Sequence, residues 1–195
     1  DDVRRKMIAG NWKMNKTVSE AIELAEDIVM ETNGTLNEVV VFPPFTALES
    51  VADAIDGKHV GYGAQDLHWE DAGAYTGAVS GAMIADICAE YVLVGHSERR
   101  AIFGDNEAVV AKKMVAAYRN GLKPMLCVGE NLEEREAGKT ARKIAMQLRN
   151  ALRVITAEQS ESLVVDYEHV WTIGSGKAAT REDAQVGCCL IREKI

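Results

Sequence analysis

Glu168 follows a short apolar run, Leu163–Tyr167, and precedes a segment that contains Gly174 and a second glycine. A carboxylate can act as a general base when a rigid element aims it, and a glycine-containing loop beside it can form a mobile lid. This order of residues therefore suits a base on a strand end beneath a lid. Glycines are also common in ordinary turns, so the stretch becomes specific only together with two others.

The two other stretches also follow apolar runs. They are Ala9–Asn15, which contains Lys13, and Tyr91–Arg100, which contains His96. Taken alone, a lysine at a strand end is usually a solvated charge, and a lone histidine is more often a hydrogen-bonded structural residue. Whether these two residues have a functional role depends on the elements that position them.

A regular alternation of apolar runs and helical patterns positions all three stretches. The predicted strands are Met7–Gly10, Glu38–Phe42, Val60–Ala64, Tyr91–Gly95, Pro124–Val128 and Leu163–Tyr167. The predicted helices include one after a capping box of Thr17 and Glu20, then Ala47–Ile55, Ala82–Cys88, Glu107–Arg119, Thr140–Ile155 and Arg181–Lys194. Strict alternation of strands and helices favours an α/β fold with a parallel sheet. Six such units without a linker predict one domain over residues 1–195.

The composition argues against several functional classes. The chain has 22 basic and 30 acidic residues, a net charge of −8, and 47% hydrophobic residues. An acidic chain without a basic stripe is not typical of a nucleic-acid or membrane surface, and no apolar run approaches the length of a membrane span. The charged start shows no signal-peptide pattern. We therefore expect a cytoplasmic protein that binds neither nucleic acid nor a membrane.

The four cysteines are predicted to be free thiols in a reducing compartment, because no two of them form a C-x-x-C pair. Cys88 and Cys127 lie in apolar surroundings, and Cys127 is interpreted as a core residue. The cysteines also lack the spacing of zinc ligands, so no metal site is predicted.

The three stretches, together with Phe42–Phe45, Gly63–Asp66 and Leu126–Glu130, closely resemble the triosephosphate isomerase family. The likeness runs in the same order through essentially the whole chain. It implies a parallel (βα) fold of the TIM-barrel type and a glycolytic and gluconeogenic isomerase. The expected substrates are dihydroxyacetone phosphate and glyceraldehyde 3-phosphate, and no cofactor or metal is implied.

The resemblance also implies the site residues. Glu168 matches the base that moves the proton, and His96 matches the neutral imidazole that polarises the carbonyl group. Lys13, with Asn11 beside it, matches the cation that meets the anionic substrate, and Gly174 lies where the lid meets the phosphate. The mechanism is that established for the family. It agrees with the general need for a base at the carbon that loses its proton and a hydrogen-bond donor at the carbonyl oxygen.

The sequence departs from the family pattern in length. A complete barrel has eight strands and about 250 residues, so this chain resembles a barrel truncated to about six β–α units. In the family, the units after the sixth carry the glycine-rich phosphate cradle. Two interpretations stay open: an isomerase with impaired activity, or a catalytically inactive truncated member that acts only as a stable partial barrel or self-associating unit.

Two residues close to Glu168 also differ from the family. His169 stands where the family has proline, and because proline fixes φ, we expect His169 to loosen the lid hinge. Asp166 stands where a small apolar residue is usual. Side chains alternate along a strand, so Asp166 and Glu168 should point to the same side, and one of the two pKa values should be raised. Trp171 is predicted to anchor the lid.

A long loop between the third and fourth strands predicts self-association. Residues Gly73–Val79, with Tyr75 and Thr76, match the loop through which members of the family form dimers. Unpaired edge strands would add a further tendency to associate. We expect a homodimer or a larger homo-oligomer.

Overall fold

A computed structural model describes residues 6–195 of the chain, which fall into two compact units. The first unit runs through Leu93 and includes Arg119–Lys123, and the second consists of Val94–Tyr118 and Pro124–Ile195. The single domain over residues 1–195 stays a prediction, and each unit is described by itself. None of the helices in residues 6–195 combines the length and apolar character needed to cross a bilayer.

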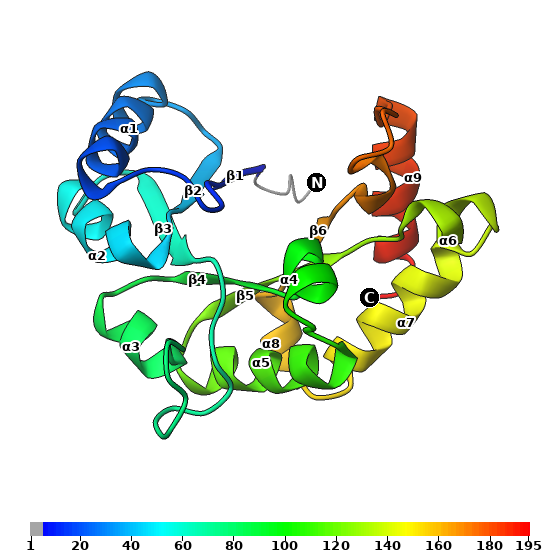
Figure 1. Cartoon of the computed structure of the whole chain (residues 1–195). Coiled ribbons are helices and arrows are strands. Elements are labelled where there is room, and N and C mark those ends of the chain that lie inside the picture. Colours follow the sequence, from blue (N-terminus) through cyan, green and yellow to red (C-terminus); the bar gives the residue numbers. More distant parts are fainter. Residues whose placement is uncertain (1–5) are drawn as a thin grey trace. The chain divides into compact units, whose positions relative to one another are not determined.

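The first unit contains parallel strands that pair in chain order. They are β1 (Met7–Asn11), β2 (Glu38–Phe42), β3 (Val60–Ala64) and β4 (Tyr91–Val94), and the helices are α1 (Val18–Glu31), α2 (Phe45–Ala54) and α3 (Gly81–Asp86). The pairing aligns Met7 with Glu38, Val39 with Val60, and Gly63 with Tyr91. Figure 1 shows α1 and α2 side by side next to these strands, where they pack against each other.

Local sequence signals explain these elements. The capping box of Thr17 and Glu20 begins α1, as predicted, and Ala21 and Ala25 on one face of this helix are fully buried. The three valines at the centre of β2 are buried as well, which is why an apolar run rather than an alternating one forms this strand. Together with residues of α2 and β3 they form the hydrophobic core of the unit.

The second unit contains two parallel strands and several helices. The strands are β5 (Lys123–Val128) and β6 (Val164–Tyr167), which pair from Met125 with Val164 to Val128 with Tyr167. The helices are α4 (Ser97–Ile102), α5 (Glu107–Arg119), α6 (Leu132–Glu136), α7 (Thr140–Leu152), α8 (Ala157–Glu161), the 3-10 helix η1 (Val170–Thr172) and α9 (Arg181–Arg192). Helix α9 packs against both α7 and β6, and α6 packs against η1 (Figure 1).

The predicted strands are confirmed at all six positions, and most of their ends differ by one residue at most. The prediction missed α6 and α8, because five residues are too few to show helical periodicity. Both helices nevertheless begin with a capping box, Asn131 with Glu134 and Thr156 with Gln159. That signal could have revealed them from the sequence alone.

The cysteines agree in part with their predicted surroundings. All four are free thiols, as expected. Cys127 is fully buried in β5, as expected for a core residue, whereas Cys88 is exposed after α3 with a positive φ. The apolar surroundings predicted for Cys88 are therefore wrong, because α3 ends at Asp86 and leaves Cys88 exposed beyond the helix.

Candidate active site

Glu168 and His96 lie in the second unit and contact each other. Glu168 directly follows β6, and its backbone N–H donates to the carbonyl oxygen of Val128 at 2.8 Å, which extends the pairing of the two strands. His96 lies two residues after the end of β4 and immediately before α4. Its Nε2 atom lies 3.3 Å from Oε2 of Glu168, and the two side chains are only 12% and 13% exposed. Two residues expected to carry the reaction are thus brought together and sheltered from water.

Hydrogen bonding determines which nitrogen of His96 carries the proton. The backbone N–H of Glu98 donates to Nδ1 at 3.2 Å, so Nδ1 acts as an acceptor. A neutral imidazole has one accepting and one donating nitrogen, so the proton lies on Nε2, which faces Glu168. The imidazole therefore presents an N–H donor toward the carboxylate.

Ser97 holds the carboxylate of Glu168 through two donors. Its backbone N–H donates to Oε1 at 3.0 Å, and its hydroxyl group donates to Oε2. Hydrogen bonds to a charged acceptor are short and directional, so they fix the orientation of the carboxylate. Sequence reasoning gave Ser97 no role. The signal that could have found it is its position as the first residue of the helix after His96.

Cys127 and Asp166 lie directly beside Glu168. The pairing of β5 and β6 sets Cys127 opposite Asp166, and the ligand-type atoms of Cys127, Asp166 and Glu168 all lie within 4.8 Å of one another. Burial raises the pKa of Asp166, and the charge of Glu168 raises it further. Burial also raises the pKa of the Cys127 thiol. The expected effect of two neighbouring carboxylates is therefore confirmed for Asp166.

Asn11 and Lys13 lie together in the first unit, at the end of β1. Lys13 has a φ of 55°, in the left-handed region that side chains rarely adopt. Its backbone N–H donates to Oδ1 of Asn11 at 2.9 Å, and its carbonyl oxygen accepts from Nε2 of Gln65 at 2.9 Å. Such a conformation costs about 1–3 kcal/mol and persists only where its surroundings hold it, often at functional sites. Gln65 belongs to a stretch that carried the resemblance, but the sequence did not reveal this supporting role.

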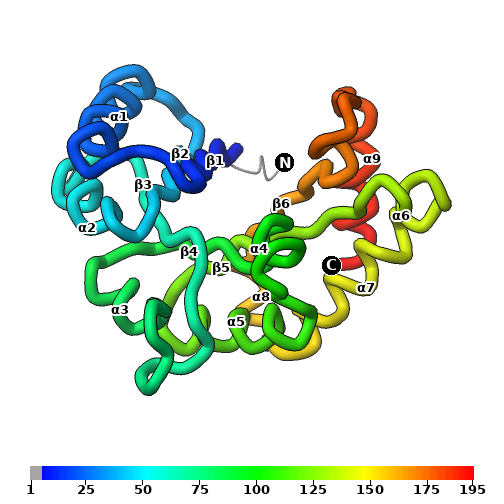
Figure 2. The backbone as a smooth tube through the Cα atoms, in the orientation of Figure 1, coloured from blue at the N-terminus to red at the C-terminus, as the bar shows by residue number. Residues whose placement is uncertain are grey.

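The segment after Glu168 forms η1 and then a glycine turn. Figure 2 traces it between β6 and α9. Gly174 is exposed with a φ of 70°, and the backbone N–H of Ser175 donates to the carbonyl oxygen of Thr172 at 3.3 Å. The segment borders a pocket of about 570 Å³ whose lining comes from α4, the start of α6 and the glycine turn: Ser97, Glu98, Ala101, Ile102, Asn131, Leu132, Glu133, Val170, Trp171, Ile173, Gly174 and Ser175.

A buried polar network supports the base of the segment after Glu168. Glu130 is fully buried and accepts hydrogen bonds from the hydroxyl of Tyr167 at 3.0 Å and from Arg135 at 3.1 Å. The Arg135 guanidinium also lies 4.1 Å from the centre of the Trp171 ring. Trp171 is 6% exposed, so it occupies the place expected for a lid anchor. The network links β6, α6 and η1.

His169 lies between β6 and η1, where a loosened hinge is predicted. Its φ of −76° falls within the range of proline, and its Nε2 atom is buried without a hydrogen-bond partner in residues 6–195. Its ring lies 4.6 Å from that of Tyr167. Proline at this position would fit the backbone and remove an unsatisfied polar atom.

We expect His169→Pro to raise the free energy of unfolding by about 0.5–1 kcal/mol and to order residues 170–177. Urea denaturation measures the first effect, and crystallographic B-factors or NMR relaxation measure the second. His169→Ala removes the imidazole without fixing φ and therefore separates the two causes. Unchanged mobility of residues 170–177 in the proline variant would contradict the prediction that His169 loosens the hinge.

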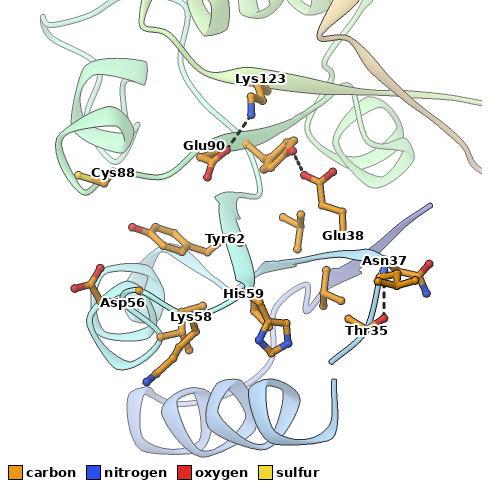
Figure 3. A pocket seen from close by; sticks show the side chains of 18 residues that line it. Thr35, Asn37, Glu38, Asp56, Lys58, His59, Tyr62, Cys88, Glu90 and Lys123 are labelled. Carbon is orange, nitrogen blue, oxygen red and sulfur yellow. Dashed lines mark hydrogen bonds and ion pairs between the residues drawn. The ribbon is translucent and has the colours of Figure 1, made fainter. Parts of the chain in front are cut away.

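A second pocket, of about 710 Å³, lies in the first unit at the amino ends of β2, β3 and β4. Figure 3 shows its charged lining, in which Glu90 pairs with Lys123 at 2.9 Å and Asn37 donates to Thr35. Active sites of parallel barrels lie at the carboxyl ends of the strands, where Asn11 and Lys13 are found. We assign no role in the reaction to this pocket.

Comparison with known proteins identifies the family. A sequence model of the triosephosphate isomerase family matches residues 6–195. The triosephosphate isomerase of Moorella thermoacetica is 50% identical over 193 residues, which cover 99% of this chain and 78% of that protein. The one of Acetivibrio thermocellus is 46% identical over 192 residues, covering 98% and 76%.

A solved structure gives the same result for the fold. The crystal structure of triosephosphate isomerase from Bartonella henselae has a TM-score of 0.86 and 34% sequence identity with this chain, covering 98% of it and 76% of the solved chain. The predicted parallel α/β fold of the TIM-barrel type is confirmed by this likeness. By sequence and by structure, the chain belongs to the triosephosphate isomerase family.

Proposed function

We propose that this chain interconverts dihydroxyacetone phosphate and glyceraldehyde 3-phosphate, with Glu168 as the base and His96 as the donor. The observation that carries the proposal is the 3.3 Å contact between Nε2 of His96 and the carboxylate of Glu168. A base and a donor that lie this close can act on two neighbouring atoms of one small substrate. The reaction belongs to glycolysis and gluconeogenesis, and we propose the cytoplasm as its location.

The proposed reaction moves one proton between the two carbons and one between the two oxygens. Glu168 takes a proton from C1 of dihydroxyacetone phosphate while His96 donates a hydrogen bond to the carbonyl oxygen at C2, which gives an enediolate. His96 then gives its Nε2 proton to the oxygen at C2 and takes the hydroxyl proton from the oxygen at C1, while Glu168 returns a proton to C2, which gives glyceraldehyde 3-phosphate. Before the first step, Glu168 has to leave the hydrogen bonds of Ser97 and turn toward the carbon.

Substrate binding falls to the other predicted residues. We propose that Lys13 meets the anionic substrate with Asn11 beside it, and that the backbone N–H of Gly174 meets the phosphate when the lid closes. The strained backbone of Lys13 supports its role, because an ordinary strand end does not need this conformation, and the position of Gly174 in the lining of the pocket beside Ser97 supports the role of the lid. Closure would also exclude water from the base.

Transfer of hydrogen from solvent tests this mechanism. In D₂O, we expect the product formed by this chain to carry deuterium at the carbon that receives the proton, because a carboxylate exchanges its proton with solvent during the reaction. Proton NMR of the product measures the label. Product without deuterium, formed equally fast by the parent chain and by Glu168→Gln, would contradict a route through Glu168.

The exposed loop Gly73–Val79 supports the proposal of self-association. Its tip is exposed, and Tyr75, which is 44% exposed, contacts the ring of His68 at 4.1 Å. We expect light scattering at micromolar concentration to show a dimer or larger species, and Thr76→Arg to shift it toward the monomer because a buried unpaired charge disfavours association. Ala179→Arg introduces the same charge on another exposed residue and is the control. A monomeric parent chain would contradict the proposal.

A specific alternative is an inactive member of the family that acts as a stable partial barrel or self-associating unit. The chain spans 76–78% of the length of the relatives described above. Within residues 6–195, the phosphate-binding groups that we propose are Lys13 and Gly174. We therefore propose impaired activity for a polypeptide of these 195 residues.

A further inference from the structure

The side chains of Cys127, Asp166 and Glu168 form a cluster that the isomerase reaction does not explain. All three lie in the second unit on one side of β5 and β6. Cys127 and Asp166 are opposite each other in the strand pairing, and Glu168 follows Asp166 by two residues, so strand alternation places it on the same side. The thiol and the two carboxylates lie within 4.8 Å of one another.

We propose that these three side chains bind one divalent zinc-like cation. A zinc ion accepts thiolate and carboxylate ligands at about 2.0–2.3 Å, so tetrahedral ligands lie about 3.3–3.8 Å apart. The three ligand atoms lie within 4.8 Å of one another, which is close to this spacing. The fourth position is then left for water, as in zinc sites with three protein ligands.

The surroundings of Asp166 support a cation at this place. Among residues 6–195, no lysine or arginine pairs with Asp166, and the basic side chains near it are the imidazoles of His96 and His169. The nearby Arg100 guanidinium pairs with Glu107 at 2.7 Å. Glu168 already accepts two hydrogen bonds from Ser97 and lies 3.3 Å from Nε2 of His96, so Asp166 is the carboxylate of the cluster that a bound cation would neutralise.

The ligand types select the cation. A thiolate is a soft ligand that favours zinc and similar ions, whereas magnesium and calcium prefer sites made of oxygen alone. Binding replaces the thiol proton: the S–H bond of Cys127 breaks, the proton passes to solvent, and a sulfur–metal bond forms. No metal site was predicted from the sequence, because the cysteines lack the spacing of zinc ligands along the chain. In the proposed site, strand pairing and not sequence spacing brings the ligands together.

The site would also regulate the enzyme, and this consequence rests on the proposed function. A cation on Glu168 occupies the carboxylate that has to accept the proton. Zinc should therefore inhibit turnover, and Asp166→Asn should reduce the sensitivity to zinc. Binding itself can be measured without any turnover, so failure of the isomerase proposal would leave the binding result intact.

Cobalt provides the spectroscopic probe. The background chain is Cys88→Ser/Cys188→Ser/Cys189→Ser, which keeps Cys127 as its single thiol and removes the exposed ones. We expect titration with Co²⁺ under anaerobic conditions to give a thiolate–metal absorption band in the near ultraviolet that saturates at one equivalent. Zn²⁺ should displace the cobalt and yield its affinity by competition.

Variants on this background decide the assignment. Cys127→Ser should lose the band, and Asp166→Asn should weaken zinc binding by at least about tenfold, since even indirect partners of a metal ligand change affinity 10–100-fold. Far-UV circular dichroism checks the fold of each variant, and Asp166→Ala replaces Asp166→Asn if the latter does not fold. A folded background chain without the band, or unchanged zinc affinity in both Asp166 variants, overturns the proposal.

Discussion

A polypeptide of these 195 residues is expected to isomerise glyceraldehyde 3-phosphate with a kcat/KM at least three decades below that of the Moorella thermoacetica relative. Contacts to the phosphate normally hold the substrate, close the lid and orient the reacting carbons. Loss of one charge-assisted contact costs about 1.5–3 kcal/mol, and each 1.36 kcal/mol is about tenfold in rate. Losing several such contacts therefore accounts for a decrease of three decades or more in kcat/KM.

Two features of the described residues make this loss hard to offset. Lys13 and Gly174 are the groups that we propose for the phosphate, and the net charge of −8 supplies no attractive field for a dianion. A lid that closes incompletely also admits water around Glu168, which weakens the electrostatic interactions that stabilise the enediolate.

The decisive experiment is a coupled assay with protein free of host isomerase. Glu168→Gln should remove the remaining activity, because it keeps the shape of the side chain but cannot accept the proton. Glu161→Gln changes an exposed glutamate of α8 in the same way and is the matched control. Activity near that of the relative, lost only in Glu168→Gln, would contradict the impairment. Equal activity in the parent and Glu168→Gln would favour the inactive alternative.

Much of this architecture could be read from the sequence because it depends on local patterns. The run Val39–Val41 predicts a buried strand wherever it packs, and the motifs around His96 and Glu168 indicate the residues that meet in the structure. The short helices α6 and α8 were missed because periodicity needs more turns than they have. Their capping boxes were the available signal.

Other features depend on contacts that no local pattern reveals. The alternation rule places Asp166 beside Glu168, but only the register of β5 and β6 places Cys127 there as well. The two hydrogen bonds from Ser97 to Glu168 likewise join residues from different strand ends. Register arises from packing of the whole sheet, so these neighbours require coordinates.

Gly129→Ala should lower kcat/KM about a hundredfold and the free energy of unfolding by about 1–3 kcal/mol. Gly129 follows β5, and a Cβ atom there would lie 2.1 Å from the carbonyl oxygen of Glu168 and 3.0 Å from Val170. The nearest of these atoms belongs to the backbone, so no side-chain rotation relieves the clash. The strand end that carries the base has to move by about 1 Å to restore ordinary contact distances.

The added methyl group should displace Glu168 and not Gly129, because a hydrogen bond to a buried side chain holds Gly129 on its other side. The backbone N–H of Gly129 donates at 2.9 Å to Oε1 of Gln147, and Gln147 is itself only 2% exposed. Moving Gly129 would leave buried polar groups unpaired, at about 1–3 kcal/mol each. Displacing Glu168 instead stretches the backbone hydrogen bond from its N–H to the carbonyl oxygen of Val128. It also shifts the carboxylate away from His96 and Ser97.

Gly61→Ala is the matched control, because it adds the same methyl group to β3 at ordinary contact distance, 3.6 Å from Cγ2 of Val40. Urea denaturation and kcat/KM of the two variants should separate a general cost of replacing glycine from a displacement of the base. If Gly129→Ala and Gly61→Ala alter kcat/KM equally, then close packing of Gly129 against Glu168 does not position the base. A loss confined to Gly129→Ala would show that the absence of a side chain at this glycine determines where the carboxylate lies.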